Sequence, residues 1–351
     1  MNLLYIVIAI LIFGVIIVIH ELGHFLVAKS CGVKVNEFAI GMGPKIFSFG
    51  KGETKYSLRA LPIGGYVSME GEDDESNDPR AFGRKKVWQR LLVVLAGATM
   101  NLILGFVILI IVTSCSDDII TTQIAKFESE TAASHMTGLE VGDKIINVNG
   151  SRIFSDADLS YQFQVDEDMT FDMTVIRNGE KVNLPAVKFD AVTLEDGTQT
   201  LHIDFYVVGE KVNPLSVIKY SSGKFVSVSK MIIQSVVDLV RGKYGLNDLS
   251  GPVGIVGAIG DVVGSTQQGV AVGDMLLNLA SFVVFITINV GIFNLLPIPA
   301  LDGSRAVFLI IEGIRRKPIN PKYEGIIHFA GLALLLLLMV IVTFSDIMKL
   351  F

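Results

Sequence analysis

A stretch of apolar residues long enough to cross a membrane begins at residue 3, and a metal-binding pattern continues it. Leu3 to Ile19 contains only apolar residues and glycine, and His20-Glu21-Leu22-Gly23-His24 follows directly. Two histidines at i and i+4 of a helix point to the same side, so both imidazoles can bind one zinc ion. Glu21 is placed to take a proton from zinc-bound water. Because ionisable groups are costly in lipid, their presence here indicates a functional site.

The same pattern also has a simpler interpretation, in which the two histidines are hydrogen-bonded to neighbouring carbonyl groups inside a helix bundle. The bare pattern is short enough to arise by chance. Its position inside an otherwise apolar helix favours the metal site.

Composition indicates a membrane protein with several spans. Apolar residues make up 51% of the chain and charged residues only 18%, whereas soluble domains carry about 25% charge. The formal net charge of -6 comes without a basic cluster suited to nucleic acid, so no nucleic-acid partner is expected. The two cysteines, Cys31 and Cys115, do not form a disulfide framework.

Apolar stretches predict four transmembrane helices. They cover residues 3–28, 91–113, 276–296 and 325–344. Pro297 and Pro299 interrupt the third stretch at its end. Between the second and third spans lies a long, mostly polar region over residues 116–274.

The distribution of lysine and arginine predicts the orientation of these spans. Both residue types are frequent in the loop over residues 29–90 and again over residues 305–322, and cytoplasmic loops carry this excess. Both termini and the long insert are then extracytoplasmic. The histidine pair falls within the membrane, nearer its cytoplasmic side.

The insert contains a segment, residues 119–208, that reads as a compact α+β domain. Gly138 to Gly150 combines a turn, an apolar strand and an Asn-Gly turn, and Asn178-Gly179 predicts a hairpin. Residues 155–165 fit a short helix. The pattern resembles a PDZ domain, which commonly binds an extended peptide at a sheet edge. A peptide ligand and a spacer that binds nothing remain equal alternatives.

Residues 209–274 form a predicted amphipathic linker region. Apolar side chains recur over residues 213–243 at helical spacing, with lysine and serine between them. Such a helix either lies on the lipid at the outer membrane face or packs against the helix bundle. The sequence leaves both open.

The first cytoplasmic loop contains a candidate membrane-associated β-hairpin. Tyr56 to Leu61 is strand-like, and we expect a turn at Gly64-Gly65 that allows close backbone approach. A substrate helix must unwind before cleavage, and a strand edge can pair its exposed backbone. We therefore expect Gly64 and Gly65 to bind substrate. The alternative is an ordinary cytoplasmic loop.

The chain has few candidates for a third zinc ligand at membrane depth. A catalytic zinc usually has three protein ligands and one open position for water. His328 lies in the fourth span and can equally be a hydrogen-bonded bundle histidine. Asp302 follows the two prolines after the third span, where a turn can bring its carboxylate to the zinc. Taken alone, Asp302 is better explained as a helix N-cap.

Taken together, these segments resemble the site-2 family of intramembrane zinc proteases, and in particular the bacterial regulators of membrane stress signalling. The resemblance rests on the histidine motif, on the PDZ-like insert and on the segment from Asn294 to Gly303, NLLPIPALDG. Pro62 to Val67 and Ser250 to Ile255 extend it, so it covers nearly the whole chain.

The resemblance implies roles for individual residues. His20, His24 and Asp302 would bind Zn²⁺, Glu21 would be the catalytic base, and Asn294 would help to hold the substrate strand. The expected activity is zinc-dependent endopeptidase cleavage of transmembrane segments in a bacterial cell membrane. Expected substrates are membrane proteins with a single transmembrane helix, such as anti-sigma factors or signal-peptide remnants.

The expected fold is a polytopic α-helical membrane protein with an inserted PDZ-like domain. It divides into residues 1–115, with two spans, the motif and the β-rich loop; 119–208, the PDZ-like domain; 209–274, the linker; and 275–351, with the last two spans. The second span has Ala96-Gly97-Ala98-Thr99-Met100-Asn101, where the family usually has Gly-Pro before the asparagine. The role of Asn101 therefore stays open.

Two other classes of protein compete with the enzyme. A membrane-anchored PDZ scaffold would hold a structural zinc, but structural sites have four protein ligands and we find three. A zinc transporter would also carry intramembrane histidine and aspartate, but it would need neither Glu21 nor a peptide-binding domain.

Overall fold

The computed structural model describes residues 2–72, 76–165, 168–193, 199–243, 245, 249–317 and 319–349. Contacts divide the chain into two compact units. Unit 1 comprises Met1–Val107 and Val236–Phe351, and unit 2 comprises Ile108–Ser235. Unit 2 therefore includes most of the helix over Pro214–Val240.

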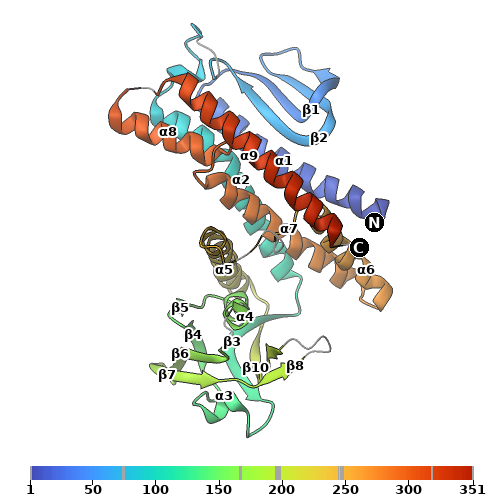
Figure 1. The fold of residues 1–351 in the computed structure, drawn as a ribbon, viewed down its shortest axis with the longest axis vertical. Helices are drawn as coiled ribbons and strands as arrows, with labels where there is room; N and C mark the ends of the chain where they lie inside the picture. Colours follow the sequence, from blue (N-terminus) through green and yellow to red (C-terminus); the bar gives the residue numbers. More distant parts are fainter. Residues whose placement is uncertain are drawn as a thin grey trace. The chain divides into compact units, whose positions relative to one another are not determined.

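Four helices of the described residues are long and apolar enough to cross a membrane, as the sequence predicted (Figure 1). They are α1 (Leu3–Ser30), α2 (Val87–Ser114), α7 (Val272–Leu295) and α9 (Pro321–Met348). Only 11% of the most apolar window of α1, and the same share in α9, is buried within the protein. Apolar helices that stay this exposed are suited to lipid rather than water.

Glycines allow the central helices to approach closely. A methyl group added at Gly23 of α1 would lie 2.8 Å from Met100 Cγ of α2. At Gly105 of α2 it would lie 2.6 Å from Ile288 Cγ1 of α7, and Gly291 of α7 faces α2 in the same way. Membrane helices gain little from hydrophobic contact with one another, so small residues that permit tight packing are typical of their interfaces.

Two shorter helices complete the α-helical part of unit 1. Helix α8 (Asp302–Arg315) follows the proline-rich turn after α7. Helix α6 (Pro252–Gly264) packs against α1, α7 and α9. The buried carboxylate of Asp346 in α9 accepts hydrogen bonds from the N–H groups of Gly251 and Gly254, each at 2.8 Å, and so caps α6. Single turns of 3-10 helix occur at η1 (Phe82–Arg84) and η3 (Ser265–Gln268).

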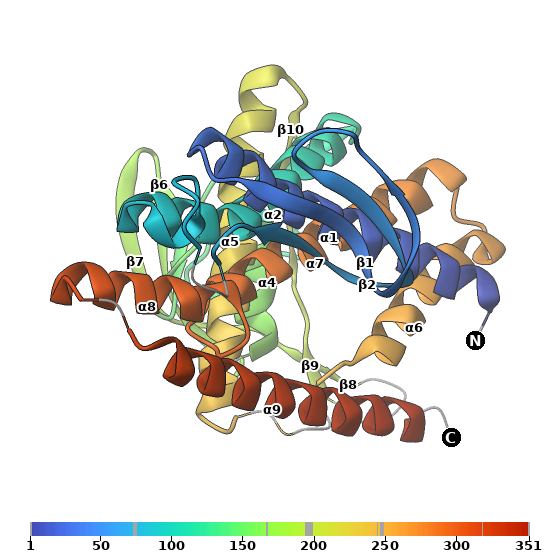
Figure 2. The ribbon, with the colours of Figure 1, turned by 90° about the horizontal axis from the view of Figure 1, so that it is seen from above.

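The loop between α1 and α2 forms the predicted strand pair, β1 (Val35–Phe49) and β2 (Lys55–Met69), which lies along α1 (Figure 2). One part of the prediction was wrong, because Gly64-Gly65 is not a turn after a finished strand but lies inside β2. Ile40 pairs with both Leu58 and Gly65, so β2 bends between these two residues. Gly64 has a φ of 75°, which lets the chain bend there and continue pairing with β1.

Unit 2 contains a sheet of six described strands in the order β10-β3-β4-β6-β7, with β5 paired to β4. Two short helices and a separate strand pair accompany it. The bounds are β3 (Asp118–Phe127), α3 (Ala133–Met136), β4 (Lys144–Val148), β5 (Ser151–Arg152), α4 (Asp156–Val165), β6 (Thr170–Arg177), β7 (Glu180–Lys188), β8 (Ala191–Thr193), β9 (Gln199–Leu201) and β10 (Phe205–Lys211).

The predicted apolar strand, short helix and hairpin of this unit are confirmed as β4, α4 and β6–β7. Asn178 and Gly179 connect β6 to β7 with positive φ angles of 52° and 87°, as a two-residue hairpin turn requires. The core of the unit includes Phe171, Ile145 and Leu139, all fully buried. This core lies within the unit's own residues, so the insert has a hydrophobic interior independent of the membrane helices.

The predicted amphipathic helix is confirmed as α5 (Pro214–Val240). Its first part packs against α4 through polar side chains, a partner that the sequence did not indicate. Ser227 Oγ donates to Asp158 Oδ2 at 2.5 Å, and Lys230 Nζ lies 2.9 Å from Asp158 Oδ1. The carboxylate is fully buried, so these partners are needed to offset its desolvation.

Candidate metal centre

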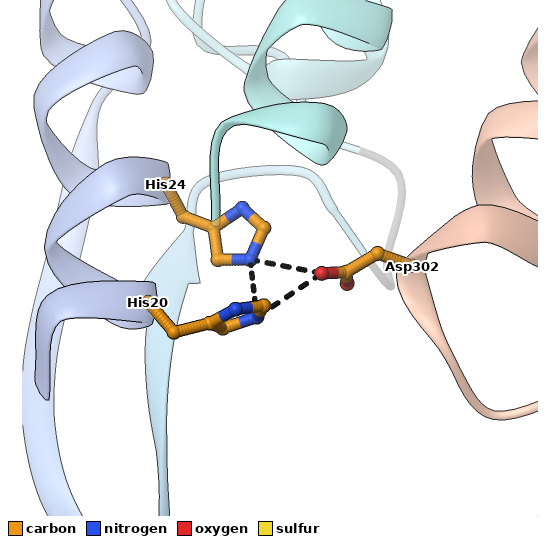
Figure 3. Close-up of side chains that lie close together, drawn as sticks. All are labelled: His20, His24 and Asp302. Carbon is orange, nitrogen blue, oxygen red and sulfur yellow. Dashed lines mark hydrogen bonds and ion pairs between the residues drawn. The ribbon is translucent and has the colours of Figure 1, made fainter. Parts of the chain in front are cut away.

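Three of the residues selected from the sequence converge in unit 1 (Figure 3). His20 and His24 lie on successive turns of α1 with their Nε2 atoms 3.2 Å apart. Asp302 Oδ2 lies 3.1 Å from Nε2 of His20 and 3.3 Å from Nε2 of His24. The side chains are 13%, 12% and 22% exposed, in the order His20, His24, Asp302. The group is therefore largely shielded from solvent.

These distances fit a tetrahedral zinc site. Zinc lies about 2.0–2.2 Å from nitrogen and oxygen ligands, so two ligands at the tetrahedral angle are about 3.3–3.5 Å apart. The three observed separations of 3.1–3.3 Å agree with this value. Asp302 Oδ2 is also a buried acceptor without a hydrogen bond of good geometry to the described residues. Three electron-pair donors thus surround one point, as a cation requires.

The chain reaches Asp302 through the turn that ends α7. Pro297 and Pro299 lack an N–H and prevent the helix from continuing beyond Leu295. Ala300 has a φ of 75°, which is unusual for a residue with a Cβ. The chain then enters α8 at Asp302, so the carboxylate is on a helix that starts beside the histidines.

His328, the alternative third ligand, has a different position. Its Nδ1 accepts a hydrogen bond from the Ala300 N–H at 3.2 Å. Gly331, one turn further along α9, allows close contact with Pro299, whose carbonyl carbon would lie 2.7 Å from an added methyl group. Helix α9 thus supports the turn that presents Asp302. The structure brings Asp302, and not His328, to the histidine pair.

Helix α2 supports both imidazoles, a role that the sequence did not reveal. A methyl group at Gly97 would lie 2.7 Å from Nε2 and Cε1 of His20 and in still closer contact with His24. The Val93 carbonyl lies 2.8 Å from His24 Nδ1, and Asn101 Nδ2 lies 3.3 Å from His20 Nδ1. The sequence feature that could have indicated this role is Gly97, which lies about one helical turn before Asn101 in a membrane span.

A cavity of about 220 Å³ opens beside the metal site. Glu21 faces it, and a methyl group at Gly65 would lie 2.9 Å from Glu21 Cγ. The lining residues are His20, Glu21, His24, Gly65, Tyr66, Val67, Met69, Glu72, Val93, Val94, Asp302 and Arg305. Gly64 instead faces Met42, and neither Gly64 nor Asn294 is among the described lining residues. Of the three residues expected to bind substrate, only Gly65 borders the cavity.

Charged and polar side chains surround the cavity. Arg305 Nη1 lies 2.5 Å from Glu72 Oε1, both in the lining. Tyr66 is in contact with the Arg59 guanidinium, which stands 4.9 Å above its ring. Partial burial raises the pKa of the neighbouring Glu37, but hydrogen bonds from Ser57, Tyr66, Arg59 and Lys45 outweigh it and lower that pKa to about 2. This polar surface is compatible with water inside the cavity.

Comparison with known proteins identifies the family. The model of peptidase family M50 matches residues 8–338, which is nearly the whole chain. The chain therefore belongs to this peptidase family.

Relatives matched over nearly their whole length agree with that assignment. A protein of Clostridium acetobutylicum is 37% identical, over 99% of this chain and 98% of the relative. The regulator of sigma-W protease RasP of Bacillus subtilis is 33% identical, over 97% and 98%. The zinc metalloprotease RasP of Bacillus licheniformis is 32% identical over the same shares. The chain is thus a zinc metalloendopeptidase of the membrane, and the enzyme is favoured over the scaffold and the transporter.

Proposed function

We propose that this chain cleaves membrane-spanning segments of membrane proteins at a zinc centre held by His20, His24 and Asp302, with Glu21 as the general base. The observation that best supports this proposal is that the three ligand atoms lie within 3.1–3.3 Å of one another. Glu21 lines the adjacent cavity. One open coordination position toward that cavity is what a catalytic zinc needs.

The chain's own residues would share the work of hydrolysis. When bound, zinc would polarise the scissile carbonyl and make water acidic enough to be deprotonated near neutral pH. Glu21 would take that proton and return it to the leaving amine. His20, His24 and Asp302 would hold the ion in place throughout. The Glu72–Arg305 pair would help to keep the cavity hydrated.

The bent strand β2 is the proposed guide for the substrate. A peptide bond inside a membrane helix is hydrogen-bonded, so the substrate helix must unwind, and its exposed backbone then needs partners. Gly65, Tyr66 and Val67 belong both to β2 and to the cavity lining. A substrate segment paired along this strand would pass beside Glu21. Gly65 would keep the approach open, with Gly64 setting the bend and Asn294 holding the segment.

The proposed orientation places β1–β2 and the loop before α9 in the cytoplasm, and both termini and unit 2 outside. The lysine and arginine content of the two loops supports it. For residues 119–208 we propose a PDZ-like domain that binds an exposed peptide tail. Its support is the Gly138 to Gly150 segment, which forms the turn before β4 and the strand itself. Titration of tail peptides onto the whole chain tests this, and absence of saturable binding would favour a spacer.

The RasP relative of Bacillus subtilis is named as a regulator of sigma-W. By that similarity we propose substrates with a single transmembrane helix, such as anti-sigma factors that have already been shortened outside, or signal-peptide remnants. A panel of such substrates in reconstituted membranes would identify the class.

Replacing Glu21 with glutamine gives the sharpest test of the mechanism. The amide has nearly the same shape as the carboxylate but cannot take a proton from water, so cleavage should fall below about 1% of wild type. Zinc content should stay at one ion per chain. The matched control is Glu53→Gln, outside the cavity, which should cleave normally. Cleavage by Glu21→Gln at the control rate would exclude Glu21 as the base.

A further inference from the structure

A cluster of basic residues lies where the end of α8 meets the start of α2. This basic cluster consists of Lys86, Arg315, Arg316 and Lys317, all of them exposed. A methyl group added at Gly313 of α8 would lie 3.5 Å from Val87 Cγ1 of α2, which is ordinary van der Waals contact. The two helix ends are therefore neighbours, and every member of the cluster is close to this contact in the sequence. Because consecutive Cα atoms are only about 3.8 Å apart, the long basic side chains can surround one ligand.

The positive charge of the basic cluster is not neutralised within the described part of the chain. Other cations of unit 1 are paired with carboxylates, and the pairs include Lys29–Glu53, Lys34–Asp78, Arg80–Glu53 and Arg90–Glu312. Among the described residues, no ion pair joins a member of the basic cluster to a carboxylate. The charge of the cluster is therefore left for an anionic ligand.

Exposed apolar side chains of α8 lie next to the basic cluster. They are Val307, Ile310, Ile311 and Ile314, which share one face of the helix at spacings of three and four residues. Another face of α8, with Ala306 and Leu309, is buried in the core of unit 1. Ile314 is 78% exposed and directly precedes Arg315. A helix with a free apolar face and cations at its end is suited to the boundary between lipid tails and headgroups.

Trp88 indicates the depth of the cluster in the membrane. It is the second residue of α2, one of the helices apolar enough to cross a membrane, and it is 55% exposed. Leu92, one helical turn further along α2, is also exposed. Tryptophan is enriched where membrane spans meet the headgroups. The basic cluster, which begins two residues before Trp88, therefore belongs at the level of the headgroups.

We propose that the basic cluster binds the headgroup of an anionic phospholipid, whose acyl chains lie against the exposed apolar face of α8. Arginine and lysine recognise phosphate through charge-assisted hydrogen bonds. Basic clusters beside a membrane span or on an amphipathic helix select anionic lipids in this way. The free apolar face of α8 favours a lipid over a soluble phosphate, which would leave that face uncovered. The lipid would hold α8, the helix that begins at Asp302, against the membrane surface.

Trp88 is the only tryptophan of the chain, so its fluorescence reports on lipid at this site. Brominated acyl chains quench tryptophan fluorescence on contact. The whole chain is reconstituted in phosphatidylcholine vesicles that contain a small fraction of brominated phosphatidylglycerol or, separately, of brominated phosphatidylcholine.

The wild-type chain gives the first result without any variant. At equal fractions, brominated phosphatidylglycerol should quench Trp88 more strongly than brominated phosphatidylcholine. The difference should decrease as salt is added, because salt screens exposed charges. Equal quenching by the two brominated lipids would overturn the proposal. Loss of the difference on addition of inorganic phosphate at constant ionic strength would indicate a soluble anion as the ligand and would also overturn it.

Paired variants then locate the site. Each basic residue near an anionic lipid contributes about fivefold in affinity, so Arg315→Gln/Arg316→Gln should weaken the preference for phosphatidylglycerol by about 25-fold. The conservative pair Arg315→Lys/Arg316→Lys should keep the preference. The matched control is Lys51→Gln/Lys55→Gln, which removes the same charge from exposed residues of the β1–β2 pair and should behave like wild type. An unchanged preference in the first pair, or an equal loss in the control, would refute the basic cluster as the site.

Discussion

Replacing Gly97 with alanine should disable the metal centre while leaving the helix itself intact. The added methyl group would lie 2.7 Å from Nε2 and Cε1 of His20, whereas ordinary contacts begin at 3.4 Å. Either the His20 ring or α2 must therefore move by about 0.7 Å, the difference between the two distances, and the closer contact with His24 requires a larger shift. Zinc sites tolerate ligand displacements of only about 0.2 Å.

The expected loss is large for a single methyl group. Zinc affinity should fall by about 10- to 100-fold, and a displacement approaching 1 Å at the reacting centre should lower cleavage by about 100-fold. Helix propensity acts in the other direction, since alanine in place of glycine stabilises a helix by about 1 kcal/mol. A loss of zinc without loss of helix content is therefore the characteristic result.

The assay is zinc affinity and cleavage by the reconstituted whole chain, with helix content from circular dichroism. Gly14→Ala is the matched control, because it lies on α1 and an added methyl group there meets nothing within 4 Å. Gly14→Ala should bind and cleave like wild type. If Gly97→Ala did the same, α2 would not be packed beneath the imidazoles, and the close contact of Gly97 with His20 and His24 would be refuted.

Three further predictions concern the surroundings of the site. His328→Ala leaves the Ala300 N–H without its acceptor, which should cost about 1–3 kcal/mol, seen as a lower unfolding temperature and weaker zinc binding. Saturating zinc at about 100 times its dissociation constant should stabilise the chain by about 2.7 kcal/mol, and Glu21→Gln should show the same gain in melting experiments because Glu21 is not a ligand. The folded pKa of Glu37 is about 2, below its ordinary 4.5, so its charge stabilises the fold above pH 4.5 and this is lost as pH falls toward 2. The wild-type chain should therefore unfold at a higher temperature than Glu37→Gln at pH 6, and the difference between the two unfolding temperatures should be smaller at pH 3.

Local features of the sequence were enough to predict the four apolar helices and the histidine pair on one helix face. Hydropathy alone marks α1, and the spacing of His20 and His24 fixes their common face because helix geometry is regular. Asp302 was selected as a ligand through the resemblance of the Asn294–Gly303 segment to the site-2 protease family, because its position after two prolines alone favoured a helix N-cap. In each case the sequence pattern lies within a few residues of the helix or side chain that it predicts.

Long-range packing was not predictable in the same way. The bend of β2 depends on which parts of β1 pair with both of its ends, and a glycine pair alone looks like a turn. Similarly, α5 was recognised as amphipathic, but nothing local shows that Ser227 and Lys230 meet a buried Asp158 on α4. Hydrophobic patterns predict the type of secondary structure and its apolar face. Which other element packs against that face depends on the whole fold.

Helix α2 shows why these long-range contacts matter for the chemistry. Its Val93 carbonyl and Asn101 amide each contact one imidazole, and Gly97 between them sets how closely the helix approaches. Asn101 also accepts a hydrogen bond from Thr287 of α7, the helix that leads into the Asp302 turn. The separation of the histidine pair from the carboxylate is thus fixed through α2. Lipid supplies no hydrophobic force between membrane helices, so small residues and buried polar contacts must set that spacing. The accuracy with which the three side chains can surround a zinc ion therefore depends on how closely these helices pack.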